Sequence, residues 1–219
     1  MTQSIDIEDL YRRQLESWPL ARDNYEALAG CYRKEVSAGV HTLVLQFNPA
    51  RIRSSAAVVD REAVAKRPCF LCRSNRPAEQ IAVDWGDYEI LVNPYPIFRR
   101  HLTIASKAHE PQQIAGRVRD MLRLARVLEG MTVFYNAAGS GASAPDHFHF
   151  QAVGPEDLPM MKSIDAGMPW IASGTERVAG SDADSLAERV DGILWRMFRG
   201  GEPEVNLYAR SLGGGMLEA

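Results

Sequence analysis

The alternating segment Asp-His-Phe-His-Phe-Gln at residues 146–151 constrains the fold more than any other part of this sequence. Successive side chains of a β-strand point to opposite faces, so a strand here places His147, His149 and Gln151 on one face. The opposite face then carries only apolar side chains, those of Phe148, Phe150 and Ala152. This pattern predicts a sheet with an apolar core on one side and a rigidly held polar site on the other. The alternative is a half-buried strand whose histidines are satisfied by hydrogen bonds or water.

Helical and strand patterns alternate along the rest of the chain. Apolar residues recur at helical spacing in 6–29, with an interruption near Trp18 and Pro19, in 111–128, where Pro111 suits the first turn, and in 183–198. Strand patterns occupy 42–47, 88–93, 101–106, 132–136 and 204–210. We expect a turn at 35–40 and a surface crossing at 50–66, whereas 154–180 carries no clear pattern.

The composition argues against several classes of protein. The chain has 219 residues, enough for one sizeable core with extensions. Its 25 basic and 28 acidic residues form no long run of either sign, so we expect no generic binding to nucleic acid or to acidic lipid. No segment is apolar for long enough to cross a bilayer, and the first residues lack a secretory signal pattern. Three cysteines argue against a disulfide framework, so we expect a cytoplasmic protein.

A Cys-x-x-Cys motif, Cys69 to Cys72, is the second group of residues that could carry chemistry. Two thiolates at this spacing can bind one metal ion, and histidines from elsewhere in the chain can complete the site. The alternatives are a redox pair and two inert buried cysteines. A redox pair is typical of a βαβ setting, which the sequence around this motif lacks.

Four sequence blocks, taken in order, resemble those of the histidine-triad superfamily. They are Asn93-Pro94, residues 101–109 (His-Leu-Thr-Ile-Ala-Ser-Lys-Ala-His), Asn136 with its small-residue loop, and His-x-His-x-Gln at 147–151. The final Gln and the upstream Cys-x-x-Cys resemble the nucleotidyltransferase branch, typified by galactose-1-phosphate uridylyltransferase and the dinucleoside-tetraphosphate and nucleotide-sugar phosphorylases. The resemblance covers about residues 69–153.

The resemblance implies an α+β, HIT-like fold, in which helices flank an antiparallel sheet and a helical and strand extension precedes it. In this chain we expect residues 1–66 to form the extension packed on the core. Residues 67–219 would then form the HIT-like nucleotidyltransferase domain, within one structural domain overall. The family often dimerises, so a homodimer is also an expectation. One departure is Asp146, where the uridylyltransferases carry a proline, and another is the lack of their duplicated second half.

The resemblance also assigns roles to individual residues. It implies structural zinc on Cys69, Cys72, His109 and His147, a set that leaves no open position for water. It implies that His149 is the nucleophile and that Gln151 contacts the phosphoryl oxygens. It further implies that three residues bind substrate: Asn93 near the ribose, and Asn136 and Ser143 near the phosphate. His101 is expected to pack or to support the site from behind.

These roles imply transfer of a nucleoside monophosphate through a covalent nucleotidyl-histidine intermediate. The expected donor is a nucleotide sugar or a dinucleoside polyphosphate, and the expected acceptor is a phosphate or a sugar phosphate. Gln151 favours phosphate acceptors, because a carboxamide cannot shuttle a proton near neutral pH and ionised phosphates do not require one. The alternatives are a nucleotide hydrolase that uses the same site and a noncatalytic, zinc-stabilised nucleotide-binding module.

Overall fold

The structure is a computed structural model, and it describes residues 5–38, 41–49, 66–166, 176–198, 201 and 204–219. The helices are α1 (Ile7–Ser17), α2 (Pro19–Ala29), α5 (Val118–Val127), α6 (Pro159–Asp165) and α8 (Ala183–Met197), with short 3-10 turns at η2 (Arg73–Asn75) and η3 (Pro155–Asp157). The strands are β1 (Tyr32–Ala38), β2 (His41–Phe47), β3 (Ala82–Trp85), β4 (Tyr88–Val92), β5 (His101–Ser106), β6 (Thr132–Asn136), β7 (His149–Val153), β8 (Ala179–Gly180), β9 (Asn206–Gly213) and β10 (Met216–Glu218).

An eight-stranded sheet organises the chain, in the order β3-β4-β5-β7-β6-β9-β10-β8. All of its strand pairs are antiparallel. The histidine strand β7 lies in the middle, between β5 and β6, with Gln151 opposite Thr103 on one side and Phe134 on the other. The predicted α+β fold with an antiparallel sheet and flanking helices is therefore confirmed.

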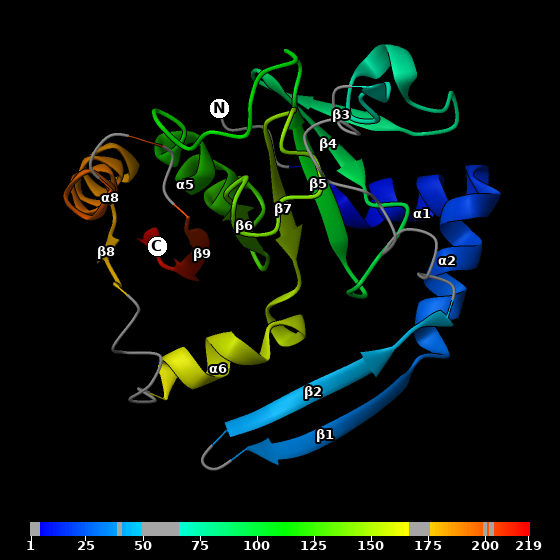
Figure 1. The fold of residues 1–219 in the computed structure, drawn as a ribbon, viewed down its shortest axis with the longest axis horizontal. Helices are drawn as coiled ribbons and strands as arrows, with labels where there is room; N and C mark the ends of the chain where they lie inside the picture. The colour runs from blue at the N-terminus through cyan, green and yellow to red at the C-terminus, as the bar shows by residue number, and fades with distance from the viewer. Residues whose placement is uncertain (1–4, 39–40, 50–65, 167–175, 199–200, 202–203) are drawn as a thin grey trace.

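The two faces of this sheet differ as the sequence predicts. Phe148, Phe150 and Ala152 are fully buried in the main hydrophobic core. Apolar side chains of α5 and α8 pack into the same core, and both helices lie together at one side of the sheet in Figure 1. We call the opposite face, which carries His149 and Gln151, the histidine face. The large apolar burial on one side fixes the register of β7 and therefore the direction of its polar side chains.

Two helices precede the sheet and pack against it, as Figure 1 shows. Leu10 and Tyr11 of α1 belong to the main core. The buried Gln14 side chain donates to the Glu79 carbonyl at 2.8 Å and accepts from the Ile81 N–H at 2.7 Å. From α2, Asn24 Nδ2 donates to the Pro94 carbonyl at 2.8 Å, and the Tyr25 hydroxyl lies 3.2 Å from the His101 carbonyl. Helix α1 therefore holds the segment that leads into β3, and α2 holds the segment between β4 and β5. The proposed boundary at residues 66 and 67 stays a prediction.

Several details differ from the sequence-based expectations. The predicted turn at 35–40 is wrong for 35–38, because β1 runs from Tyr32 to Ala38 and pairs with β2 as a separate two-stranded sheet, and 39–40 lie outside the described residues. The expected helix from Pro111 begins only at Val118, so Pro111 is not in its first turn. His147 lies in a turn just before β7 rather than on the strand. The break near Trp18 is confirmed, because α1 ends at Ser17 and α2 begins at Pro19.

Two further expectations concern the surface and membranes. The predicted surface crossing at 50–66 lies outside the described residues except for its last one. Among the residues that the structure describes, none of the helices combines the length and apolarity that a membrane span requires.

Candidate active site and metal centre

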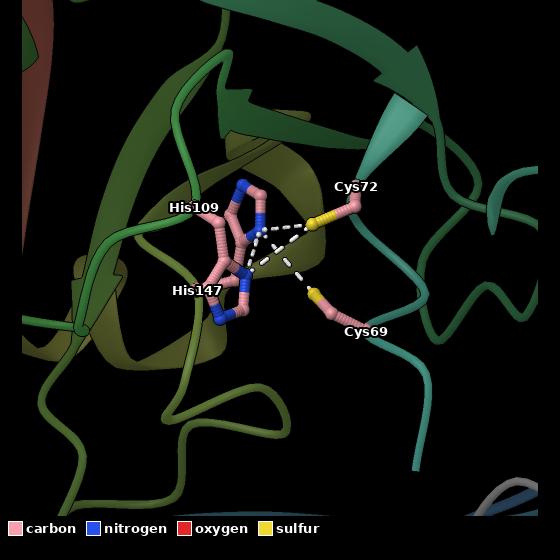
Figure 2. Close-up of side chains that lie close together, drawn as sticks. All are labelled: Cys69, Cys72, His109 and His147. Carbon is pink, nitrogen blue, oxygen red and sulfur yellow. Dashed lines mark hydrogen bonds between the residues drawn. The ribbon is translucent and has the colours of Figure 1, made fainter. Parts of the chain in front are cut away.

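Four side chains converge beside the start of β7, as Figure 2 shows. They come from three separate segments and are Cys69, Cys72, His109 and His147. His147 Nδ1 lies 3.3 Å from Cys69 Sγ, 3.5 Å from Cys72 Sγ and 3.3 Å from His109 Nδ1. Cys72 Sγ lies 3.3 Å from His109 Nδ1. All of the predicted metal ligands therefore lie together, with Cys69 and His147 buried and His109 exposed.

The donor set fits a tetrahedral metal ion. In a zinc site with bonds of about 2.1 Å to nitrogen and about 2.3 Å to sulfur, neighbouring ligand atoms are roughly 3.4–3.8 Å apart. The four separations given above, 3.3 to 3.5 Å, are close to that range. The cluster can therefore hold a metal such as zinc through two sulfur and two nitrogen atoms.

Burial disfavours Cys69 as a redox nucleophile and keeps the His147 ring available to a cation. Burial raises the pKa of Cys69 to about 11, so without a cation this residue is a neutral thiol. A redox cysteine needs a lowered pKa, because the thiolate is the nucleophile. Burial also lowers the pKa of His147, which keeps its imidazole neutral and able to bind a cation.

A hydrogen bond fixes which nitrogen of His147 faces the cluster. His147 Nε2 lies 2.8 Å from the Ser106 carbonyl oxygen. A carbonyl can only accept, so Nε2 carries the proton and Nδ1 presents its lone pair to the cluster. The Ser106 hydroxyl donates in turn to Glu110 at 2.5 Å, and Arg117 pairs with the other Glu110 oxygen at 2.5 Å. This network holds the segment that carries His109.

A second polar contact joins the cysteine motif to the turn before β7. Arg67 Nη2 lies 2.9 Å from Asp146 Oδ1, and the Arg67 guanidinium lies 4.7 Å from the centre of the Phe70 ring. Asp146 is the residue that replaces the proline of the uridylyltransferases. In this chain it therefore ties the segment before Cys69 to the segment before His147.

His149 is the first residue of β7 and is almost fully buried, at 4% exposure. Its Nδ1 lies 2.9 Å from the His147 carbonyl oxygen, so Nδ1 carries the proton and Nε2 bears the lone pair. Burial lowers the pKa of His149 to about 4, because removal from water disfavours the imidazolium. At neutral pH the ring is therefore neutral, and Nε2 is its one nitrogen with a lone pair.

Gln151 lies two residues further along the histidine face, and its carboxamide has a fixed orientation. His101 Nδ1 lies 3.3 Å from the Ile97 N–H, so its other nitrogen carries the proton. That nitrogen, Nε2, donates to Gln151 Oε1 at 2.8 Å. The amino group of Gln151 is then the end that can donate to a phosphoryl oxygen. His101 therefore orients the Gln151 side chain, and its part in a functional site stays a prediction.

The three predicted substrate-binding residues lie in different surroundings. Asn93 is half-buried: its side chain donates to Thr103 at 3.0 Å and accepts from the Tyr95 N–H at 2.9 Å. Because Thr103 pairs with Gln151, Asn93 lies across β5 from the site. Asn136 ends β6, and Ser143 is exposed in the following loop, where Gly141 has a φ of +97°. Their roles at a nucleotide stay predictions.

Gln112 is a residue that the sequence-based reasoning missed. Its buried side chain donates to the carbonyl oxygens of Asn136 at 3.0 Å and His149 at 2.9 Å, and it accepts from the His149 N–H at 2.8 Å. No sequence motif identifies this role, because the bonds reach backbone atoms of strands that are distant in the sequence.

Comparison with solved structures supports the fold. Three structures of yeast Ap4A phosphorylase Apa2 are similar to this chain at 16% sequence identity. The complex with AMP has a TM-score of 0.56 and the match covers 100% of this chain and 80% of that chain. The structure described without a ligand has a TM-score of 0.53, with 100% and 78% covered. The complex with Ap4A has a TM-score of 0.52, with 91% and 78% covered. No curated protein matches this chain in sequence.

These structures share the fold of this chain, and they agree with the HIT-like fold that the resemblance implies. Residues 10–154, more than half of the chain, match the family described as "Domain of unknown function (DUF4922)". The chain belongs to this family.

Proposed function

We propose that this protein is a nucleotidyltransferase or phosphorylase that transfers a nucleoside monophosphate through His149. The bond from His149 Nδ1 to the His147 carbonyl carries the proposal, because it leaves Nε2 as the one nitrogen with a lone pair. A neutral imidazole with a fixed tautomer is suited to attack phosphorus. The HIT-like fold, shared with an Ap4A phosphorylase, agrees with this chemistry.

The reaction has two displacement steps. His149 Nε2 forms a bond to the α-phosphorus of the donor, and the bond from that phosphorus to the bridging oxygen breaks. The leaving phosphate takes the electron pair. In the second step an acceptor phosphate oxygen attacks the same phosphorus, and the bond to Nε2 breaks with return of its electron pair to the ring. Two inversions retain the configuration at phosphorus.

The chemistry of Gln151, whose amide is oriented by His101, favours a phosphate over water as the acceptor. The Gln151 amino group can donate to a phosphoryl oxygen, but it cannot take a proton from water near neutral pH. An ionised phosphate needs no general base. The proposed donors are therefore dinucleoside polyphosphates and nucleotide sugars, and the proposed acceptors are phosphate or a sugar phosphate.

Zinc is the metal that we propose for the Cys69, Cys72, His109 and His147 cluster. Two sulfur and two nitrogen ligands are typical of structural zinc, which leaves no position for a reacting water. When bound, the ion would hold the cysteine motif against the turn that leads into β7. Its contribution would be to fix the position of His149 rather than to take part in the chemistry.

Detection of the covalent intermediate tests the proposal. The purified protein is incubated with Ap4A, or in parallel with UDP-glucose, and its intact mass is measured for the addition of one nucleoside monophosphate. The added mass should disappear in acid and survive in base, since a phosphorus–nitrogen bond to histidine is acid-labile. The His149→Asn variant should show no added mass.

Addition of phosphate distinguishes the enzyme classes. A phosphorylase consumes its adduct on addition of phosphate and releases a nucleoside diphosphate. A hydrolase releases the monophosphate without it. Nucleotide binding with no adduct from any donor would indicate the noncatalytic module and refute the proposal.

A further inference from the structure

The pairing between β6 and β7 stops short of His149. The two strands pair at Thr132 with Val153, Val133 with Ala152 and Phe134 with Gln151. Two more steps in the same register would pair Asn136 with His149, but the ladder ends at Phe134 and Gln151. The strands therefore diverge where β6 carries a proposed phosphate-binding residue and β7 carries the proposed nucleophile.

The side chain of Gln112 occupies the position between these two strand ends. Its amino group donates to both carbonyl oxygens, that of Asn136 and that of His149, while its carbonyl oxygen accepts from the His149 N–H. A carboxamide has two donor hydrogens and one acceptor oxygen, so all of its groups can be used in these bonds. The Gln112 side chain thus takes the place of a β6 partner for His149, on the side of β7 away from β5.

Gln112 is itself held from several directions. Its main-chain N–H donates to the Pro145 carbonyl at 3.2 Å, and its main-chain carbonyl accepts from the Tyr135 hydroxyl at 3.1 Å. Only 1% of its surface is exposed. Gln112 lies in a bend, and the chain does not become helical until Val118. Its carboxamide therefore sits on a rigid support.

We propose that Gln112 is a positioning residue that sets the separation and direction of His149 and Asn136 across the gap between β6 and β7. The inference rests on the proposed function, because it assigns the nucleophile to His149. Gln112 touches neither phosphate nor reacting atoms in this scheme. It acts through the main chain of the two residues that do.

Loss of the Gln112 carboxamide should affect the rate of the reaction more than the stability of the fold. Loss of the carboxamide leaves two carbonyl oxygens and one N–H of buried backbone without partners. The strand end can then shift, and a displacement of about 1 Å at a reacting group can lower a rate about 100-fold. Binding of the nucleotide should depend less on this separation, since Asn93, the proposed ribose contact, lies across β5 from the gap.

Four variants provide the test. Gln112→Met keeps a similar volume and removes every hydrogen bond of the side chain. Gln112→Glu keeps the acceptor for the His149 N–H and loses both donors. Gln113 is the neighbouring glutamine and is exposed, so Gln113→Met and Gln113→Glu are matched controls. The measurements are the rate of adduct formation at saturating Ap4A or UDP-glucose, the KM for that donor, zinc content, and hydrogen exchange of the His149 amide.

We expect both Gln112 variants to bind zinc, to form adduct about 100-fold more slowly at saturating donor and to retain a KM near that of the wild-type protein. The His149 amide should exchange faster in Gln112→Met than in either Gln113 variant. Wild-type rates in a folded Gln112→Met variant, or an equal loss in Gln113→Met, would overturn the inference. If the wild-type protein forms no adduct, the proposed function fails. Independently of that result, an unchanged exchange rate of the His149 amide in Gln112→Met would show that Gln112 does not hold the strand end.

Discussion

Replacement of Cys72 by serine should remove the metal and much of the stability that it provides. Cys72 Sγ lies 3.3 Å and 3.5 Å from the Nδ1 atoms of the two histidines, so its loss removes two contacts within the cluster. The cluster exists only in the folded chain, because its members are separated by up to 78 positions. Metal-binding energy is therefore folding energy at this site.

The magnitude follows from linkage between metal binding and folding. Free zinc at 100 to 1,000 times the dissociation constant stabilises the folded state by about 2.7–4.1 kcal/mol. In a chain of this size 1 kcal/mol shifts the melting temperature by about 2–4 °C. We therefore expect Cys72→Ser to lower the melting temperature by roughly 5–16 °C. Chelation of the wild-type protein should give a similar shift.

The assay is calorimetry with parallel zinc analysis, and Cys31→Ser is the matched control. Cys31 lies before β1, outside the cluster, and its Sγ is 3.6 Å from the Ala27 carbonyl. Cys31→Ser should retain about one zinc per chain and melt within 2 °C or so of the wild-type protein. A Cys72→Ser protein that loses zinc without a change in melting temperature would refute the argument that the ion stabilises the fold. Retention of zinc by Cys72→Ser would refute the ligand assignment.

Five other outcomes are expected. His147→Ala should release zinc, whereas His149→Asn should keep zinc and the fold and form no adduct, as measured by metal analysis and intact mass. Gln151→His should raise the ratio of hydrolysis to phosphorolysis, measured from monophosphate and diphosphate products, because an imidazole can move a proton. Arg117→Met should weaken zinc binding about 10- to 100-fold in a chelator competition. Arg117 pairs with Glu110, which bonds to the Ser106 hydroxyl, and the Ser106 carbonyl accepts from His147. Since burial lowers the pKa of His149, the rate of adduct formation should stay constant from pH 8 to pH 6, where an imidazole of ordinary pKa would already be mostly protonated.

The alternation of polar and apolar residues in β7 and the helical spacing of apolar residues in α5 correctly predicted which side chains form the core. Phe148 and Phe150 are buried where period two places them, and the apolar spacing of α5 leads into the same core. The proposed ligands Cys69 and His147 come together although the spacing of the cysteines alone could not show which histidines complete the cluster. That information came from the family resemblance.

The errors arose where tertiary contacts override local preference. His147 leaves the strand because its ring turns toward the cysteines and bonds to the Ser106 carbonyl. The helix after Pro111 begins late because Gln112 bonds to two strand ends instead of starting a helical turn. The segment 32–38 is rich in charge and pairs with β2 as a two-stranded sheet, which its own sequence does not indicate. In each case the partner is distant in sequence or lacks a motif.

The contacts of α1 and α2 have a consequence for the smallest part of this chain that can fold. A chain cut at residue 67 would leave the Glu79 carbonyl and the Ile81 N–H without Gln14, and the core without Leu10. It would also remove the Tyr25 hydroxyl from the carbonyl of His101, the residue whose ring orients Gln151. We therefore expect the smallest part that folds to include α1 and α2, and a truncation made to isolate the eight-stranded sheet would remove part of its support.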